Sequence, residues 1–195
     1  MINIETQKKN FKNHIATLTD CGNIKILDFK NPESSNYRIR FMFEEDYCRC
    51  HISGDLGSLV ATNYNNMTYE GFKDFVHNTG YFEGKIDCCQ RSIYVYDEEL
   101  AEKQLREKLE EIAEYPEVDD EIDIDDVVDD MMRDFEDTTG FGSLAYAALS
   151  EYDSDCWEYI SDLGKEETGI LELYMLAFEL ATQQLKEREG QEVSA

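Results

Sequence analysis

The side chains of this chain that could do chemistry are mostly carboxylates, and they gather in one segment. Between Glu114 and Asp137 the sequence holds 13 acidic residues and one basic residue, Arg133. Residues three or four positions apart share one face of a helix, and such a stripe is formed by Asp123, Asp126, Asp130, Asp134 and Asp137. Apolar residues fall on the opposite side. The pattern predicts an amphipathic helix over residues 123–137 with a row of carboxylates facing solvent.

A row of like charges is unfavourable for the helix that carries it. Carboxylates at i,i+4 repel each other by roughly a few tenths of a kcal/mol per pair, and Asp forms helices less readily than Glu. Charges about 5–6 Å apart on a helix approach the phosphate spacing of a nucleic-acid strand. We therefore expect this surface to imitate a nucleic-acid backbone and to bind a positively charged protein; the predicted partner-binding residues are Glu117, Asp119, Asp120, Glu121, Asp123, Asp126, Asp130, Asp134 and Asp137.

Two other interpretations of the acidic segment stay open. One is a highly soluble, charge-rich helical domain that uses the charge for nothing else. The other is a calcium site, whose loop needs Asp-x-Asp-x-Asp-Gly and a closing Glu. Here Asp119, Glu121 and Asp123 are followed by Ile124 instead of Gly. The spacing argues against a specific calcium site, and we predict no metal ligand.

Zinc and nucleophilic chemistry find little support. No pair among the six Cys has the Cys-x2-Cys spacing of a zinc site, so we expect free, mostly buried thiols in a reducing compartment. The sequence contains no Gly-x-Ser-x-Gly motif, P-loop or dinucleotide fingerprint. We predict no catalytic residue and no cofactor, with a small metal-dependent hydrolase as the least favoured alternative.

The charge of the chain is unevenly distributed. Its formal net charge is −26, from 44 acidic and 18 basic residues. Residues 1–96 hold 12 acids and 11 bases, whereas residues 97–195 hold 32 acids and 7 bases. Direct binding of DNA or RNA requires Lys and Arg that displace counterions from phosphates, and anionic membranes attract basic segments. The composition therefore argues against both as ligands, and with neither a signal peptide nor a membrane-spanning run we expect a cytoplasmic protein.

Hydrophobic periodicity predicts the elements that position the acidic segment. Residues 3–19 have apolar side chains at helical spacing. From residue 23 to residue 63 the period changes to two, with recurring turn residues, which predicts an antiparallel meander. Start signals predict later helices that begin at Thr68, Asp97, Asp123, Ser143, Asp155 and Thr168. The fold class is α+β, a small antiparallel sheet in the N-terminal half followed by a helical, strongly acidic C-terminal half.

Three regions follow from this pattern. Residues 1–96 form a near-neutral α+β part, and residues 97–187 form an acidic helical part that packs with it as one unit. Residues 188–195 are expected to be a frayed tail. The most apolar helix, predicted over residues 168–186, is expected to enter the core, and the alternative use of its apolar side is a homodimer interface.

The overall character of the chain resembles small acidic proteins of bacteriophages and mobile elements of low-GC bacteria, of the anti-CRISPR type. The resemblance rests on the Asn/Lys/Ile/Tyr-rich N-terminal half, the acidic C-terminal half and the segment His51-Ile52-Ser53-Gly54-Asp55-Leu56-Gly57-Ser58. It covers most of the chain without a defined motif and therefore assigns no site residue. It implies a target, an RNA-guided CRISPR nuclease, whose nucleic-acid channels are rich in Lys and Arg.

We therefore expect a phage-type inhibitor without enzymatic activity, which binds the basic nucleic-acid-binding surface of a bacterial defence nuclease. The alternative from a different class is an acidic immunity protein or antitoxin that neutralises a basic toxin. Arg38, Arg40 and Arg49 of the predicted sheet are expected either to stabilise the scaffold or to form a second contact.

Overall fold

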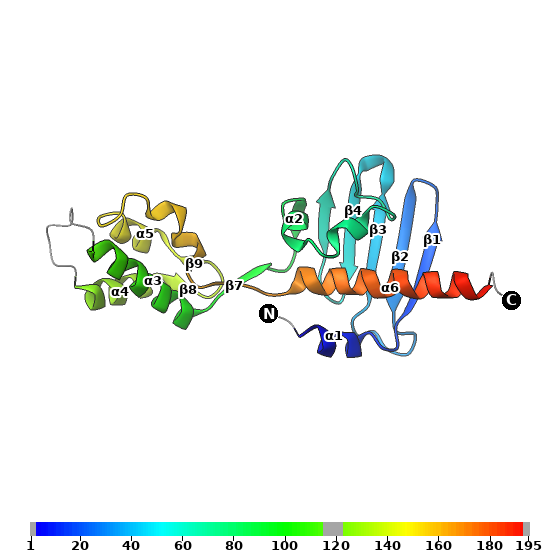
Figure 1. The fold of residues 1–195 in the computed structure, drawn as a ribbon, viewed down its shortest axis with the longest axis horizontal. Helices are drawn as coiled ribbons and strands as arrows, with labels where there is room; N and C mark the ends of the chain where they lie inside the picture. The colour runs from blue at the N-terminus through cyan, green and yellow to red at the C-terminus, as the bar shows by residue number, and fades with distance from the viewer. Residues whose placement is uncertain (1–2, 115–122, 193–195) are drawn as a thin grey trace. The chain divides into compact units, whose positions relative to one another are not determined.

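The computed structural model describes residues 3–114 and 123–192. These residues group into two compact units (Figure 1). Unit 1 consists of residues 1–93 and 169–195, and unit 2 consists of residues 94–168. Unit 2 is therefore an insertion in the chain of unit 1. Within the described residues no helix is long and apolar enough to cross a membrane.

Unit 1 is built on a six-stranded sheet in which consecutive strands pair antiparallel. Every second residue points to the same side of a strand, and those of the inner side are buried, for example Phe41 and Phe43 of the third strand. The register aligns inner-face residues across strands, as Leu27 pairs with Phe41 and Phe41 with Ile52. The strands are β1 (Ile15–Asp20), β2 (Ile24–Lys30), β3 (Ile39–Glu44), β4 (Arg49–Gly54), β5 (Leu59–Thr62) and β6 (Ile86–Cys89).

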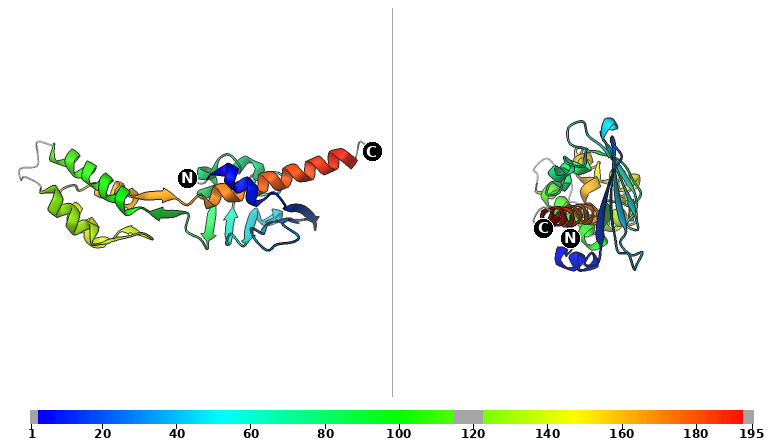
Figure 2. Two further views of the ribbon diagram at one scale, coloured as in Figure 1. Left: turned by 90° about the horizontal axis from the view of Figure 1, so that it is seen from below. Right: turned by 90° about the vertical axis from the view of Figure 1, so that its right-hand side faces the viewer.

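The inner face of the sheet is covered by the long helix α6 (Ile170–Glu192). Figure 2 shows α6 and the short helix α1 (Ile4–Asn10) on the same face of the sheet. Phe178 of α6 meets the sheet and its neighbours edge-on, with ring centroids 5.4 Å from Phe41 and 4.8 Å from Phe72. Such aromatic pairs add about 0.5–1.5 kcal/mol each beyond their area burial. The same core is completed by the 3-10 turn η2 (Phe72–Phe75) and by α2 (Thr79–Glu83).

Unit 2 has its own small core between three helices. The helices are α3 (Glu98–Ala113), α4 (Ile124–Met132) and α5 (Ser143–Leu149). Their inward residues include Leu105, Val128 and Leu149, and none of these belongs to the core cluster of unit 1. The unit also contains the 3-10 turns η3 (Cys156–Glu158) and η4 (Ile160–Asp162) and two strand pairs: β7 (Tyr94–Tyr96) with β10 (Lys165–Glu167), and β8 (Phe135–Glu136) with β9 (Gly140–Phe141).

The α+β class is confirmed, but several predicted elements differ. The helix predicted over residues 3–19 stops at Asn10, and Ile15–Asp20 forms an edge strand instead. β-Branched residues at alternate positions favour a strand, and Gln184 of α6 holds this one by accepting from the backbone N–H of Ala16 at 2.6 Å. The sheet therefore has one more strand at each end than the predicted meander. β1 pairs with β2 at one end, and β6 pairs with β5 at the other.

The division of the chain also differs from the three predicted regions. The helix predicted over residues 168–186 begins at Ile170, continues to Glu192 and packs on the sheet rather than with the acidic helices. Its residues Tyr174, Ala177 and Ala181 are fully buried in the core of unit 1. Periodicity identified the buried side of this helix correctly, but it carries no information on which unit the helix covers.

Candidate protein-binding surface

Unit 2 holds most of the charge of the molecule. Residues 94–168 contain 27 acidic and 5 basic residues, a net charge of −22, which leaves 17 acidic and 13 basic residues, a net charge of −4, for unit 1. The insertion therefore carries nearly all of the excess negative charge. This concentration is sharper than the division of the sequence into halves indicated, because the near-neutral helix α6 returns to unit 1.

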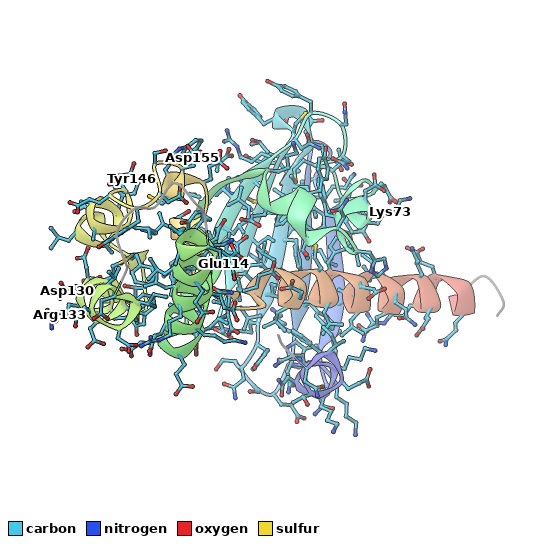
Figure 3. All side chains as sticks on the ribbon, turned by 60° about the vertical axis from the view of Figure 1, so that its left-hand side comes forward. Lys73, Glu114, Asp130, Arg133, Tyr146 and Asp155 are labelled. Atoms are coloured by element: carbon cyan, nitrogen blue, oxygen red, sulfur yellow. The ribbon has the colours of Figure 1, made fainter. Side chains whose placement is uncertain are left out.

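The apolar sides of the helices turn the carboxylates of α4 outward. α4 places Val128 and Met131 in the core of unit 2. Four aspartates on its remaining circumference are exposed, and we call them the α4 acidic face: Asp125, Asp126, Asp129 and Asp130. Figure 3 shows Asp130 and Arg133 projecting from the outer side of this helix. The helix thus presents a compact group of negative charges to solvent.

The few basic residues of unit 2 are already engaged by carboxylates. Arg106 contacts Glu102 at 3.0 Å and Asp125 at 2.6 Å, and these hydrogen bonds raise the pKa of its guanidinium. Arg133 contacts Asp130 at 2.6 Å. The other three, Lys103, Lys108 and Lys165, each lie within 3.8 Å of a carboxylate. With its five cations paired internally, unit 2 retains a large uncompensated negative charge.

The structure places only part of the predicted stripe on this face. Asp126 and Asp130 are exposed on α4, as predicted. Asp123 is the N-cap of the helix, where its carboxylate accepts from the backbone N–H of Asp126 at 3.3 Å. The predicted loop residues Glu117, Asp119, Asp120 and Glu121 lie outside the described residues.

The helix predicted over residues 123–137 ends at Met132, which corrects the last part of the stripe. Phe135 and Glu136 leave the helix and pair with Gly140 and Phe141 in a short hairpin, in which the rings of Phe135 and Phe141 meet at 5.2 Å. Asp137 lies in the turn of this hairpin, exposed but off the helix. A regular five-carboxylate row is therefore absent, because pairing of the two Phe residues competes with continuation of the helix.

Asp134, one of the predicted partner-binding residues, has its carboxylate engaged within unit 2. One of its carboxylate oxygens accepts from the backbone N–H groups of Leu144 at 2.8 Å and Ala145 at 3.0 Å. These are orphan donors of the first turn of α5, which a carboxylate satisfies. A Cβ atom at Gly142 would lie 2.6 Å from the Asp134 carboxylate, so this glycine permits the close approach.

Substitution of Asp134 is expected to destabilise unit 2. Asp134→Ala leaves two N–H groups of α5 without their acceptor, which by analogy with N-cap substitutions costs about 1–2 kcal/mol. Urea unfolding followed by the fluorescence of Trp157, the single Trp of the chain, measures this loss. Asp137→Ala, which removes the same charge from the exposed hairpin turn, should shift the midpoint far less; an equal shift would refute the assigned role.

The sequence analysis did not predict the exposed apolar side chains of unit 2. Leu144 of α5 and Tyr152, which follows this helix, are 73% and 38% exposed, while Ala145 and Leu149 are buried. Trp157 is 60% exposed. Trp and Tyr are the side chains most enriched at energetically important interface positions.

Acidic side chains flank these apolar residues. Glu151 and Asp155 are exposed, whereas Asp153 is used internally: it accepts from the hydroxyl of Tyr159 at 2.9 Å. Burial and this carboxylate raise the pKa of Tyr159. Figure 3 shows Tyr146 and Asp155 on the same unit as the α4 acidic face. Unit 2 therefore offers exposed aromatic and aliphatic groups in a strongly negative environment.

Comparison with known proteins adds no identification. No protein-family model, curated protein or solved structure matched the chain. Among the described residues, no group of three or more His, Cys, Asp or Glu side chains is arranged to hold a metal ion. The inference about function therefore depends on the surface of unit 2 itself.

Proposed function

We propose that this protein binds a positively charged protein surface through unit 2. The observation that carries the proposal is the concentration of a net charge of −22 in one inserted unit whose own basic residues are all paired. Self-repulsion of this size destabilises a compact state, so the charge needs a compensating use. A complementary partner supplies one, because opposite potentials steer association and suppress wrong partners.

The partner that fits best is a nucleic-acid-binding protein, with an RNA-guided bacterial defence nuclease as the leading candidate. Such a protein has channels lined with Lys and Arg that receive phosphates. The α4 acidic face would compete for these side chains, and the exposed Trp157 and Leu144 would add apolar contacts that phosphates do not offer. The shortened stripe favours an acidic patch with aromatic contacts over a regularly spaced copy of a phosphate backbone.

A competition experiment tests this proposal. The full chain is immobilised and a purified RNA-guided nuclease is passed over it, with and without its target duplex DNA, at low and high salt. We expect association that weakens steeply with salt and is displaced by DNA, together with loss of DNA cleavage. Binding that DNA does not displace would place the contact away from the nucleic-acid channel. No binding at any salt would reject the nuclease and favour a basic toxin as partner.

A further inference from the structure

A second site, in unit 1, has properties opposite to those of the acidic surface. A hollow of about 500 Å³ lies where the start of β4, the end of β5 and the start of β6 meet. This volume is within the range of small-ligand pockets, roughly 300–1,000 Å³. We name it the Arg49–Lys85 pocket, and its lining includes Tyr47, Cys48, Arg49, Asn63, Tyr64 and Lys85.

Backbone hydrogen bonds fix the three segments of this pocket. Arg49 is paired with Thr62 in the β4–β5 register. The N–H of Asn63 donates to the carbonyl of Cys48 at 3.0 Å, and the N–H of Thr62 donates to the carbonyl of Lys85 at 2.9 Å. Arg49, the first residue of β4, and Lys85, which directly precedes β6, are therefore tied to the same short segment, Thr62 and Asn63. The pocket lies at the ends of the strands, where hydrogen bonds of the sheet anchor the connecting segments that line it.

Neither cation of the pocket lies within hydrogen-bond distance of a carboxylate of the described residues, in contrast to Arg40 of β3. Arg40 is held by Asp28 through two hydrogen bonds of 2.7 and 2.8 Å. Arg49, by contrast, has a carboxylate oxygen of Glu44 at 3.9 Å, beyond hydrogen-bond reach, as its nearest among the described residues. That same oxygen lies 3.0 Å from the imidazole of His51. The Nε of Arg49 is buried and has no hydrogen-bond partner among the described residues.

Lys85 is likewise available to an anion. Its ammonium lies 4.6 Å from the ring centroid of Tyr81, and no carboxylate of the described residues lies within 4.0 Å of it. The acid nearest along the strand, Asp87, accepts from the hydroxyl of Thr62 at 3.1 Å. The pocket thus offers one guanidinium and one ammonium with unused donors, the two groups that proteins use most for phosphate.

Two aromatic rings stand at the same pocket. Tyr47 is 70% exposed and Tyr64 is 93% exposed, the two most exposed of the tyrosines whose side chains are described. Between them in the pocket, Cys48 has a left-handed backbone with φ of 51°, and its thiol donates to the carbonyl of Tyr64 at 3.7 Å. A non-glycine residue in this conformation is strained, and such strain concentrates at functional sites. Exposed rings beside cations suit a base that stacks and a phosphate that pairs.

We propose that the Arg49–Lys85 pocket binds a nucleoside monophosphate, with the phosphate on Arg49 and Lys85 and the base against Tyr64 or Tyr47. The site is small and local, so it is consistent with the absence of a basic stripe for long DNA or RNA. Unit 1 has a net charge of only −4, so the long-range field of this unit opposes an anion weakly. This inference does not rest on the proposed function of unit 2.

Calorimetric titration of the full chain with AMP, GMP, CMP and UMP tests the proposal, with adenosine and inorganic phosphate as separate arms. We expect one site that binds at least one of the nucleotides roughly tenfold or more tighter than either fragment alone, because the phosphate and base contacts act together. Lys85→Gln and Arg49→Gln should each weaken nucleotide binding about tenfold. The double variant Tyr47→Ala/Tyr64→Ala should weaken nucleotide binding and leave phosphate binding unchanged.

The matched control is Lys30→Gln, which removes one exposed positive charge from β2, outside the pocket. It should leave nucleotide binding unchanged. Because Tyr47 and Tyr64 are 70% and 93% exposed, the double variant should fold like the parent chain. Unchanged nucleotide binding by this variant would therefore contradict the proposed base contact. Absence of saturable binding for all four nucleotides, or equal weakening by Lys30→Gln and Lys85→Gln, overturns the proposal.

Discussion

Replacing all four residues of the α4 acidic face with Asn should weaken association with the basic partner by roughly tenfold or more. Exposed ion pairs are each worth about 0.2–1 kcal/mol, so four of them sum to roughly 1–4 kcal/mol. Most of this loss should appear as slower association and a flatter dependence on salt, because the charges act at long range before contact. Surface plasmon resonance at several salt concentrations measures both quantities.

The same substitutions should leave the fold nearly unchanged. Asp125 and Asp126 lie in the first turn of α4 and interact favourably with the positive end of the helix, whereas Asp129 and Asp130 lie near its negative end. Removing the first two charges destabilises the helix and removing the last two stabilises it, each by roughly 0.3–1 kcal/mol, so the changes largely cancel. Arg106 loses Asp125 but keeps Glu102 at 3.0 Å. Circular dichroism and thermal unfolding should therefore give values close to those of the parent chain.

A matched control removes four acids from unit 1 in place of unit 2. Suitable exposed positions are Glu33, Glu70, Asp74 and Glu189. Replacing them with Gln or Asn changes the net charge of the chain by the same amount. Binding should be reduced much less than in the α4 variant. If both variants lose affinity equally, net charge rather than the α4 acidic face governs association, and the proposed interface is wrong.

Local sequence signals predicted most of the fold. Asp97 was identified as an N-cap, and it accepts from the N–H of Leu100 at 2.8 Å. The alternation in residues 39–44 gave a strand with Ile39, Phe41 and Phe43 inward, as observed. These features depend on neighbours in sequence, which is why the sequence shows them. His14 shows the limit: it falls in the helix predicted over residues 3–19, yet it lies between α1 and β1, where it is buried against Phe11 and Phe29, and burial lowers its pKa.

The candidate site was harder to predict because its residues have competing uses. The sequence shows that Asp126, Asp130 and Asp134 share a helical spacing, but only tertiary structure shows that Asp134 caps α5. Likewise, Arg40 and Arg49 look equivalent in sequence. Asp28 on the adjacent strand engages the first, and no carboxylate of the described part of the chain lies within hydrogen-bond reach of the second. Which polar group is already satisfied depends on long-range pairing, and that decides which residues remain for a ligand.

The second large effect is expected from removing unit 2. Replacing residues 94–168 with a short Gly-Ser linker should leave unit 1 folded, since its core cluster contains no residue of the insertion. Tyr94 of β7 is the register partner of Glu167 of β10, and paired antiparallel residues lie about 4.5–5.5 Å apart. The chain therefore leaves and re-enters unit 1 at nearby points that a short linker can join. A cooperative thermal transition of the shortened chain measures this.

The shortened chain also separates the two proposed activities. It should lose nuclease binding almost completely, since a net charge of −22 goes with the insertion and −4 remains. It should keep nucleotide binding, because the Arg49–Lys85 pocket lies wholly in unit 1. Retained, salt-sensitive nuclease binding would move the interface to unit 1 and reject the role assigned to the acidic insertion. Loss of nucleotide binding in a folded variant would instead reject the pocket, so each proposal can fail without the other.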